Sequence, residues 1–130
     1  MADTYLDSLK VATALGYGAT GGVTGVGGTK TQITTSATAV TLDKPCGQIT
    51  TVALTTAAAA EEAFVVNNTS VDADDVIVVN TTYAGAGKPI VFVTNVGAGV
   101  FTVNITNVHA TDALNAVLVV NFAVIKVVTT

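Results

Sequence analysis

The chain has 130 residues, of which 50% are hydrophobic and 11% are charged, and it carries a net charge of −4 with a single cysteine. That length is enough for a domain with a core of its own, without metals or disulfides. The charged fraction is far below the roughly 25% of ordinary soluble domains. The basic residues are five scattered lysines, which cannot neutralise a row of phosphates, so nucleic acid is not an expected partner.

No segment has the pattern of a membrane span or a secretory signal. The longest apolar stretch, residues 113–128, is interrupted by Asn121 and Lys126, whereas a transmembrane helix needs about 20 mostly apolar residues. Near the start, Asp3 and Asp7 lie where a signal peptide carries basic residues. We therefore expect no membrane partner and a protein that stays where it is made.

The first 28 residues differ in composition from the rest of the chain. Apolar residues recur at helical spacing after a capping-box pattern, which predicts a short helix over residues 3–15. Residues 16–28 contain seven glycines without a period of three, which is typical of a connecting arm and not of collagen. We therefore divide the chain into an N-terminal Gly-rich arm, residues 1–28, and a body, residues 29–130.

The body has the period of two that β-strands show. Phe101, Val103 and Ile105 alternate with polar residues, as expected of a strand with one face in the core and one in water. Other runs are apolar on both faces, and they span residues 63–67, 76–80, 90–96 and 117–128. With turn residues at short intervals between the runs, the pattern predicts an all-β fold: an antiparallel β-sandwich or jelly roll of about seven or eight strands. The second apolar face of those runs is expected to meet a neighbour.

No residues in the chain have the spacing of a catalytic or cofactor-binding motif. Hydrolases with a Ser or Cys nucleophile usually use a histidine base, and the single histidine, His109, is interpreted as an exposed loop residue. Cys46 lacks metal-ligand spacing and is interpreted as a small buried hydrophobe. Residues 85–88 resemble part of a phosphate loop, but Pro89 follows the lysine, so a hairpin turn is preferred. We predict no enzymatic activity, no cofactor and no metal site.

An acidic segment leaves one alternative open. Asp72, Asp74 and Asp75 are close enough in sequence to share a hard cation such as Ca²⁺. The segment lacks the glycine and the distal glutamate of a calcium-binding loop, so a solvated acidic turn is the preferred interpretation. A small calcium-dependent hydrolase or lectin-like protein is the corresponding alternative function.

Short blocks of the body resemble phage head-fibre and capsid-decoration (cement) proteins. The blocks begin with Gly-Gly-Thr at residues 27–29 and end with Asn-Phe-Ala-Val-Ile-Lys at residues 121–126. The blocks between them lie at residues 31–32, 39–44, 46–50, 64–68 and 74–76. The resemblance covers about residues 27–127 and leaves most of the arm outside.

This resemblance implies a virion structural protein without catalytic residues, commonly a homotrimer, on the outer surface of an icosahedral capsid. It would be made in the cytoplasm of the bacterial host, and its partners would be the major capsid protein and further copies of itself. The composition points to assembly as well, because so apolar a surface is expected to be covered by other subunits. The alternative is a fibre base or tip module that recognises a host receptor or glycan, with a contact around Tyr83.

The arm supplies the candidate partner-binding residues. It joins a short amphipathic segment to a run of glycines and cannot form a core of its own. We predict that Tyr5, Leu6 and Leu9 insert against a neighbouring subunit or the capsid surface. The glycines would let the backbone bend and approach closely.

Overall fold

Eight β-strands and their connecting loops make up the part of the chain that the computed structural model describes, residues 27–129. The strands are β1 (Gly27–Thr31), β2 (Val40–Thr41), β3 (Cys46–Thr50), β4 (Glu61–Asn67), β5 (Val76–Tyr83), β6 (Pro89–Gly97), β7 (Val100–Asn107) and β8 (Leu118–Ile125). The helix predicted over residues 3–15 lies outside the described residues. So do Tyr5, Leu6 and Leu9.

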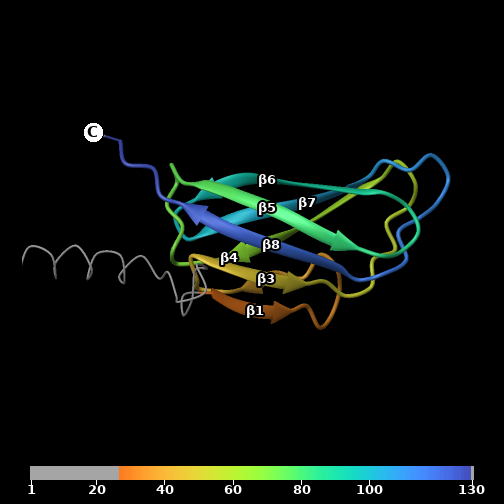
Figure 1. Ribbon diagram of the computed structural model, residues 1–130, viewed down its shortest axis with the longest axis horizontal. Coiled ribbons are helices and arrows are strands. Elements are labelled where there is room, and N and C mark those ends of the chain that lie inside the picture. The colour runs from red at the N-terminus through yellow and green to blue at the C-terminus, as the bar shows by residue number, and fades with distance from the viewer. Residues whose placement is uncertain (1–26, 130) are drawn as a thin grey trace, which may run out of the picture.

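The strands form two four-stranded sheets packed face to face (Figure 1). One sheet has the order β1-β3-β8-β5 and the other the order β2-β4-β7-β6. The predicted β-sandwich is therefore confirmed. Its sheets are mixed, because β1 pairs with β3 and β2 with β4 in parallel, whereas the other pairings are antiparallel.

The parallel pairs follow from the path of the chain, which passes from one sheet to the other between most consecutive strands. Each crossing reverses the direction of the chain, so two crossings return it to the first sheet in its original direction. The connection at residues 84–88 is one such crossing, because β5 and β6 lie in different sheets. The hairpin turn predicted at residues 85–88 is therefore wrong.

Apolar side chains from both sheets fill the space between them. Phe101, Val103 and Ile105 are completely buried, as their alternation predicts. The ring of Phe101 packs against that of Phe122 from the other sheet, with centroids 5.5 Å apart. The opposite face of β7 is less exposed to solvent than predicted, because Asn104 is buried there. Its Nδ2 donates a hydrogen bond to Thr94 Oγ1 at 2.7 Å.

Two glycines allow β1 and β3 to lie close together beneath Leu42. Gly28 and Gly47 are register partners. A Cβ on Gly47 would lie 2.8 Å from the carbonyl oxygen of Gly28 and 2.8 Å from Leu42 Cδ2. Gly27 and Gly28, predicted to end the arm, thus belong to the first strand of the sandwich.

One end of the sandwich is held together by Asn107, a completely buried residue at the end of β7. Its Nδ2 donates to the carbonyl oxygens of residues 56, 57 and 112 at 3.2, 3.1 and 2.8 Å. Its Oδ1 accepts the backbone N–H groups of residues 88 and 109 at 3.0 and 3.1 Å. The amide therefore joins three loops that are far apart in sequence.

Candidate interaction surface

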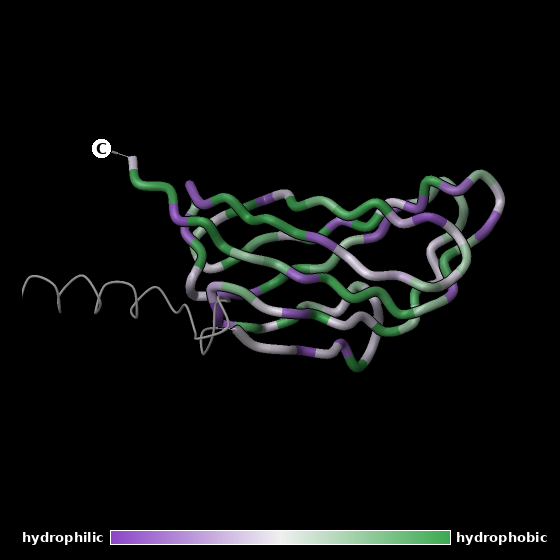
Figure 2. The backbone as a smooth tube through the Cα atoms, viewed as in Figure 1, coloured by the Kyte–Doolittle hydropathy of each residue, from purple (hydrophilic) through white to green (hydrophobic). Residues whose placement is uncertain are grey.

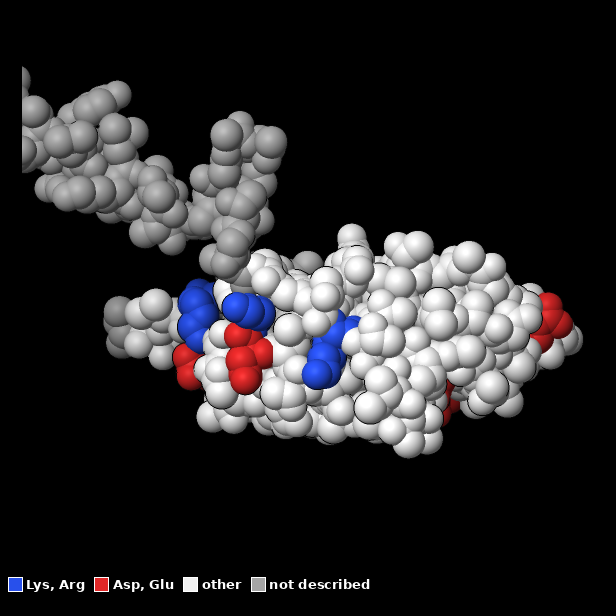
Figure 3. All heavy atoms as spheres, turned by 90° about the horizontal axis from the view of Figure 1, so that it is seen from below, with Lys and Arg blue, Asp and Glu red and all other residues white. Residues whose placement is uncertain are grey.

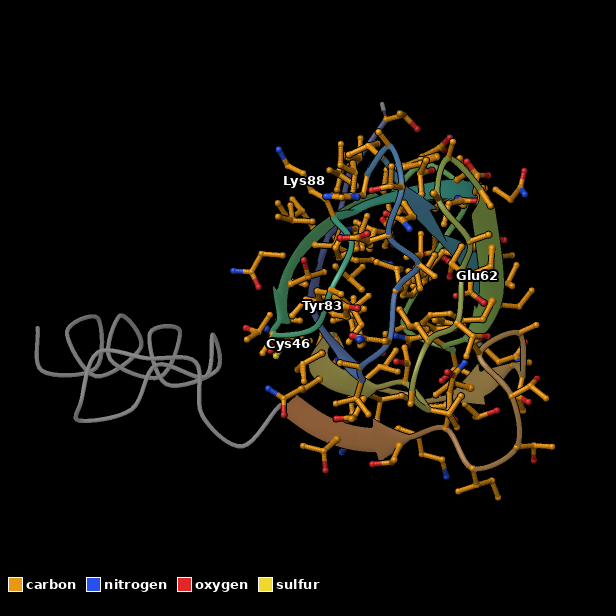
Figure 4. All side chains as sticks on the ribbon, turned by 90° about the vertical axis from the view of Figure 1, so that its right-hand side faces the viewer. Cys46, Glu62, Tyr83 and Lys88 are labelled. Atoms are coloured by element: carbon orange, nitrogen blue, oxygen red, sulfur yellow. The ribbon has the colours of Figure 1, made fainter. Side chains whose placement is uncertain are left out.

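The reactive side chains in the described part of the chain form small groups that are held within the fold, and at one of them Ser36 Oγ and Thr56 Oγ1 both donate to the Glu62 carboxylate. In Figure 4, Glu62 and Lys88 lie on different sides of the body, away from Cys46 and Tyr83. Cys46 and Tyr83 overlap in this view but lie at opposite ends of the sheet, because they pair with Ala123 and Leu118 of β8. Among residues 27–129, no three His, Cys, Asp or Glu side chains are grouped so that they could hold a metal ion. Cys46 is partly exposed on the outer side of β3, and the interpretation of this residue as a buried hydrophobe is wrong.

His109 organises its own loop. Its Nδ1 accepts the backbone N–H groups of Thr111 at 3.3 Å and Asp112 at 2.9 Å. Its Nε2 lies 3.8 Å from Asp112 Oδ2, and the side chain is 38% exposed. The histidine is a loop residue as predicted, and these contacts give it a structural role between β7 and β8.

The acidic segment at residues 72–75 forms ion pairs with a lysine of the same chain. Lys126 Nζ lies 2.6 Å from Asp72 Oδ2 and 2.6 Å from Asp75 Oδ2. The buried Asp75 carboxylate also accepts the backbone N–H groups of Asp72 and Val127. The prediction of a solvated turn is therefore wrong for Asp75, because a lysine 51 residues later takes the place of water. The contact ties the segment after β8 to the loop before β5.

The ion pairs shift the pKa values of both partners. Hydrogen bonds from Lys126 and from the backbone N–H of Asp72 lower the pKa of Asp75 from its usual 3.8. Hydrogen bonds to Asp72 and Asp75 raise the pKa of Lys126 above its usual 10.5. Asp75 therefore stabilises the fold above its unfolded pKa and ceases to do so as the pH falls through its lower, folded pKa. Lys126 stabilises the fold below 10.5 and ceases to do so as the pH rises through its folded pKa.

The variant Asp75→Asn is expected to weaken the acid sensitivity of the fold. Stability of the unaltered chain should fall as the pH drops below about 3.8, because Asp75 takes up a proton and loses Lys126. Urea unfolding at a series of pH values measures this slope. Asp74→Asn is the matched control, since Asp74 is exposed and should leave the slope nearly unchanged. Equal slopes for Asp75→Asn and the unaltered chain would contradict the prediction.

The outer face of the sheet β1-β3-β8-β5 carries a group of exposed apolar side chains at one end. Val76 pairs with Ile125, and Val78 pairs with Ala123. Residues directly opposite each other in a sheet project to the same side. Val76, Val78 and Ile125 are 49%, 49% and 51% exposed. These four residues are referred to below as the apolar strip, and Figure 2 shows the corresponding ends of β5 and β8 in green.

The other half of the same outer face is polar. Asn80 on β5 lies opposite Asn121 on β8, which lies opposite Gln48 on β3. Gln48 Nε2 donates to Asn121 Oδ1 at 3.0 Å. A shallow depression of about 210 Å³ lies where the two halves meet, and it is lined by Val78, Asn80, Asn121, Phe122 and Ala123. The strip therefore has a defined polar boundary.

The outer face of the second sheet is also partly apolar, although its apolar side chains are interrupted. Val65, Ile90 and Phe92 are 38%, 50% and 39% exposed. Polar residues of β7, such as Thr102 and Asn104, lie beside them. The runs that the sequence predicted to be apolar on both faces thus keep one apolar face uncovered in the described part of the chain.

Charges occupy little of the surface. Seen from the β1 edge in Figure 3, blue and red atoms gather mainly toward the ends of the body and leave most of this face uncharged.

Between β1 and β2, at the open edge of the sandwich, a hollow of about 440 Å³ is lined by residues 29–34 and 38–40. The buried Gln32 lines this hollow, and its Oε1 has no hydrogen-bond partner among the described residues.

Tyr83, the suggested glycan contact, is engaged within the fold. Its hydroxyl donates to the carbonyl oxygen of Ala86 at 2.7 Å and accepts the backbone N–H of Asn115 at 2.8 Å. The hydroxyl joins the loop after β5 to the loop before β8. It is therefore not free to bind a sugar without breaking these contacts.

Comparisons of the chain with protein-family models, with curated proteins and with solved structures find no match. In the part of the chain that the structure describes, there is no helix of the length and hydropathy needed to cross a membrane. The resemblance to phage proteins consequently rests on the sequence blocks between residues 27 and 127.

Proposed function

We propose that this chain is a non-catalytic structural subunit that decorates or cements the outer surface of a phage capsid by binding the major capsid protein. The observation that carries the proposal is the apolar outer surface of the sandwich. Val76, Val78, Ile90 and Ile125 are each about half-exposed. Removing apolar surface from water contributes a favourable free energy of about 25 cal/mol per Å². A surface of this kind is typical of proteins that associate with other subunits.

Two further observations support the proposal. The side chains of Tyr83, Asp75 and His109 are each engaged by contacts within the fold, which suits a binding role better than catalysis. The resemblance of the sequence blocks to head-fibre and decoration proteins supplies the kind of particle, a virion, and the expectation of a homotrimer. The chain would then be made in the bacterial cytoplasm and join the outside of the assembled head.

In this proposal the arm is the attachment segment. Among the described residues, the buried apolar core consists of residues between 40 and 122, which fill the space between the two sheets. Tyr5, Leu6 and Leu9 are then free to bury their side chains against the capsid. Tyrosine is one of the residues that dominate such contacts, and the two leucines would add apolar area to the contact.

Binding to heads that lack the protein tests the proposal. The full chain should co-sediment with such heads, whereas deletion of residues 1–26 should leave the sandwich folded and weaken binding by at least about tenfold, or 1.4 kcal/mol. The double variant Leu6→Asp/Leu9→Asp should behave like the deletion, and Ser8→Asp in the same segment is the matched control.

The possible failures are distinguishable. A full chain that does not bind heads contradicts the proposed function. A deletion variant that binds as tightly as the full chain contradicts only the role of the arm, and would place the anchor on the outer faces of the sandwich.

A further inference from the structure

The arm joins the sandwich in the same row of residues that contains part of the apolar strip. Across the sheet, Gly27 pairs with Cys46, Cys46 pairs with Ala123, and Ala123 pairs with Val78. Figure 1 shows the start of β1, the end of β8 and the start of β5 at one end of the body. The arm of 26 residues therefore joins the body at the end of the sheet that carries the apolar strip.

The length of the arm is sufficient for it to reach the strip. Neighbouring strands are about 4.8 Å apart, so Gly27 and Val78, on the two edge strands of a four-stranded sheet, are separated by roughly 15 Å. Residues 16–26 can span up to about 35 Å when extended. Their glycines also permit the sharp change of direction that folding back over the sheet requires.

The arm and the apolar strip both carry apolar side chains that they can bury against each other. The strip consists of Val76, Val78, Ala123 and Ile125, and amide side chains mark its polar boundary. The arm carries Leu6 and Leu9 at helical spacing among polar and charged residues. So short an amphipathic segment is barely stable as a helix in water and gains most of its stability from an apolar surface.

The outer face of the second sheet is less suited to bind the arm. The exposed apolar side chains of the second sheet, Val65, Ile90 and Phe92, are separated by polar side chains. They also lie on the opposite side of the sandwich from β1, to which the arm is joined.

We propose that, in the free chain, residues 3–15 bind the apolar strip of the same molecule, with Leu6 and Leu9 against Val78, Ala123 and Ile125. A short, glycine-rich tether gives the arm an effective concentration in the millimolar range at the strip, which favours the same molecule over a second copy. Arm and strip cover each other's apolar residues until another surface competes for them. The inference concerns the free chain and does not depend on the proposed capsid.

Cys46 is a built-in probe of this contact. It is the single cysteine of the chain, it is partly exposed, and it lies beside Ala123 in the row that also contains Val78. In the full chain the bound arm should slow alkylation of this thiol by a maleimide. Leu6→Asp/Leu9→Asp should accelerate alkylation by at least about tenfold, which corresponds to a bound state favoured by 1.4 kcal/mol. Val78→Asp should have the same effect, while Ser8→Asp on the arm and Thr82→Asp on the polar half of the face are the controls.

Two further measurements complete the test. An environment-sensitive hydrophobic dye should bind the Leu6→Asp/Leu9→Asp chain more strongly than the full chain, and this readout does not depend on the thiol. Addition of a peptide of residues 1–26 to that variant should restore slow alkylation. Equal alkylation rates and equal dye binding for the full chain and the Leu6→Asp/Leu9→Asp variant would overturn the inference. Protection that increases with protein concentration would also overturn it, because a second copy would then supply the arm.

Discussion

Replacement of Asn107 by alanine is expected to lower the free energy of unfolding by about 3 kcal/mol or more. The side chain is completely buried, and it donates to three carbonyl groups and accepts two backbone N–H groups from separate loops. Truncation would leave these groups without partners in the interior. Each unsatisfied buried group costs about 1–3 kcal/mol, although water entering the cavity would recover part of that loss.

Urea unfolding of the Asn107→Ala variant measures this effect. The matched control is Asn80→Ala, because Asn80 is exposed on the outer face of β5. That change should alter the free energy of unfolding by no more than about 0.5 kcal/mol. Similar losses for the two variants would show that Asn107 is not the residue that holds the loops together.

The second large effect is expected for Gly47→Ala, which should destabilise the sandwich by about 1–3 kcal/mol. The added Cβ would lie 2.8 Å from the carbonyl oxygen of Gly28 and 3.2 Å from Phe122 Cε1. The first neighbour is backbone of the paired strand, so it cannot rotate away. Either β1 must shift or Leu42 and Phe122 must repack.

Gly97→Ala is the control for this prediction. A Cβ at Gly97 would have one neighbour within 4 Å, Val100 Cγ1 at the ordinary distance of 3.4 Å. The change should therefore be neutral or stabilising by up to about 1 kcal/mol, since alanine restricts the unfolded chain. A Gly47→Ala variant as stable as Gly97→Ala would contradict the close packing of β1 on β3.

The sandwich itself was predictable because its central strands carry strong local patterns. The alternation of Phe101, Val103 and Ile105 identifies β7, and the apolar runs identify β4, β5, β6 and β8. β1 and β3 lack such a signal. They are rich in Gly and Thr, and their strand conformation depends on the close pairing of Gly28 with Gly47 and on contact with Leu42.

Two of the errors concern contacts between distant parts of the chain. The turn residues at positions 85–88 show that the chain bends there, but not that the next strand joins the other sheet. The acidic segment gives no sign of Lys126, because its partner lies 51 residues away. Local sequence patterns contain no information on either pairing.

The apolar strip was predictable in part. The runs at residues 76–80 and 117–128 indicated two apolar faces, and hence an uncovered surface. Which of these residues point outward depends on the register that places Val76 opposite Ile125 and Val78 opposite Ala123. The same register shows that the arm joins the sheet beside the strip, which the sequence alone does not show.

Electron microscopy of the particles that co-purify with this chain from its natural source tests the proposed function most directly. The proposal predicts density of the size of the sandwich at symmetry-related positions on the outside of an icosahedral head, in contact with the major capsid protein. It also predicts that particles bearing the Leu6→Asp/Leu9→Asp chain lose this density. Heads that lack the density while the unaltered chain remains in the soluble fraction, or density on the inner surface of the shell, would contradict the proposal.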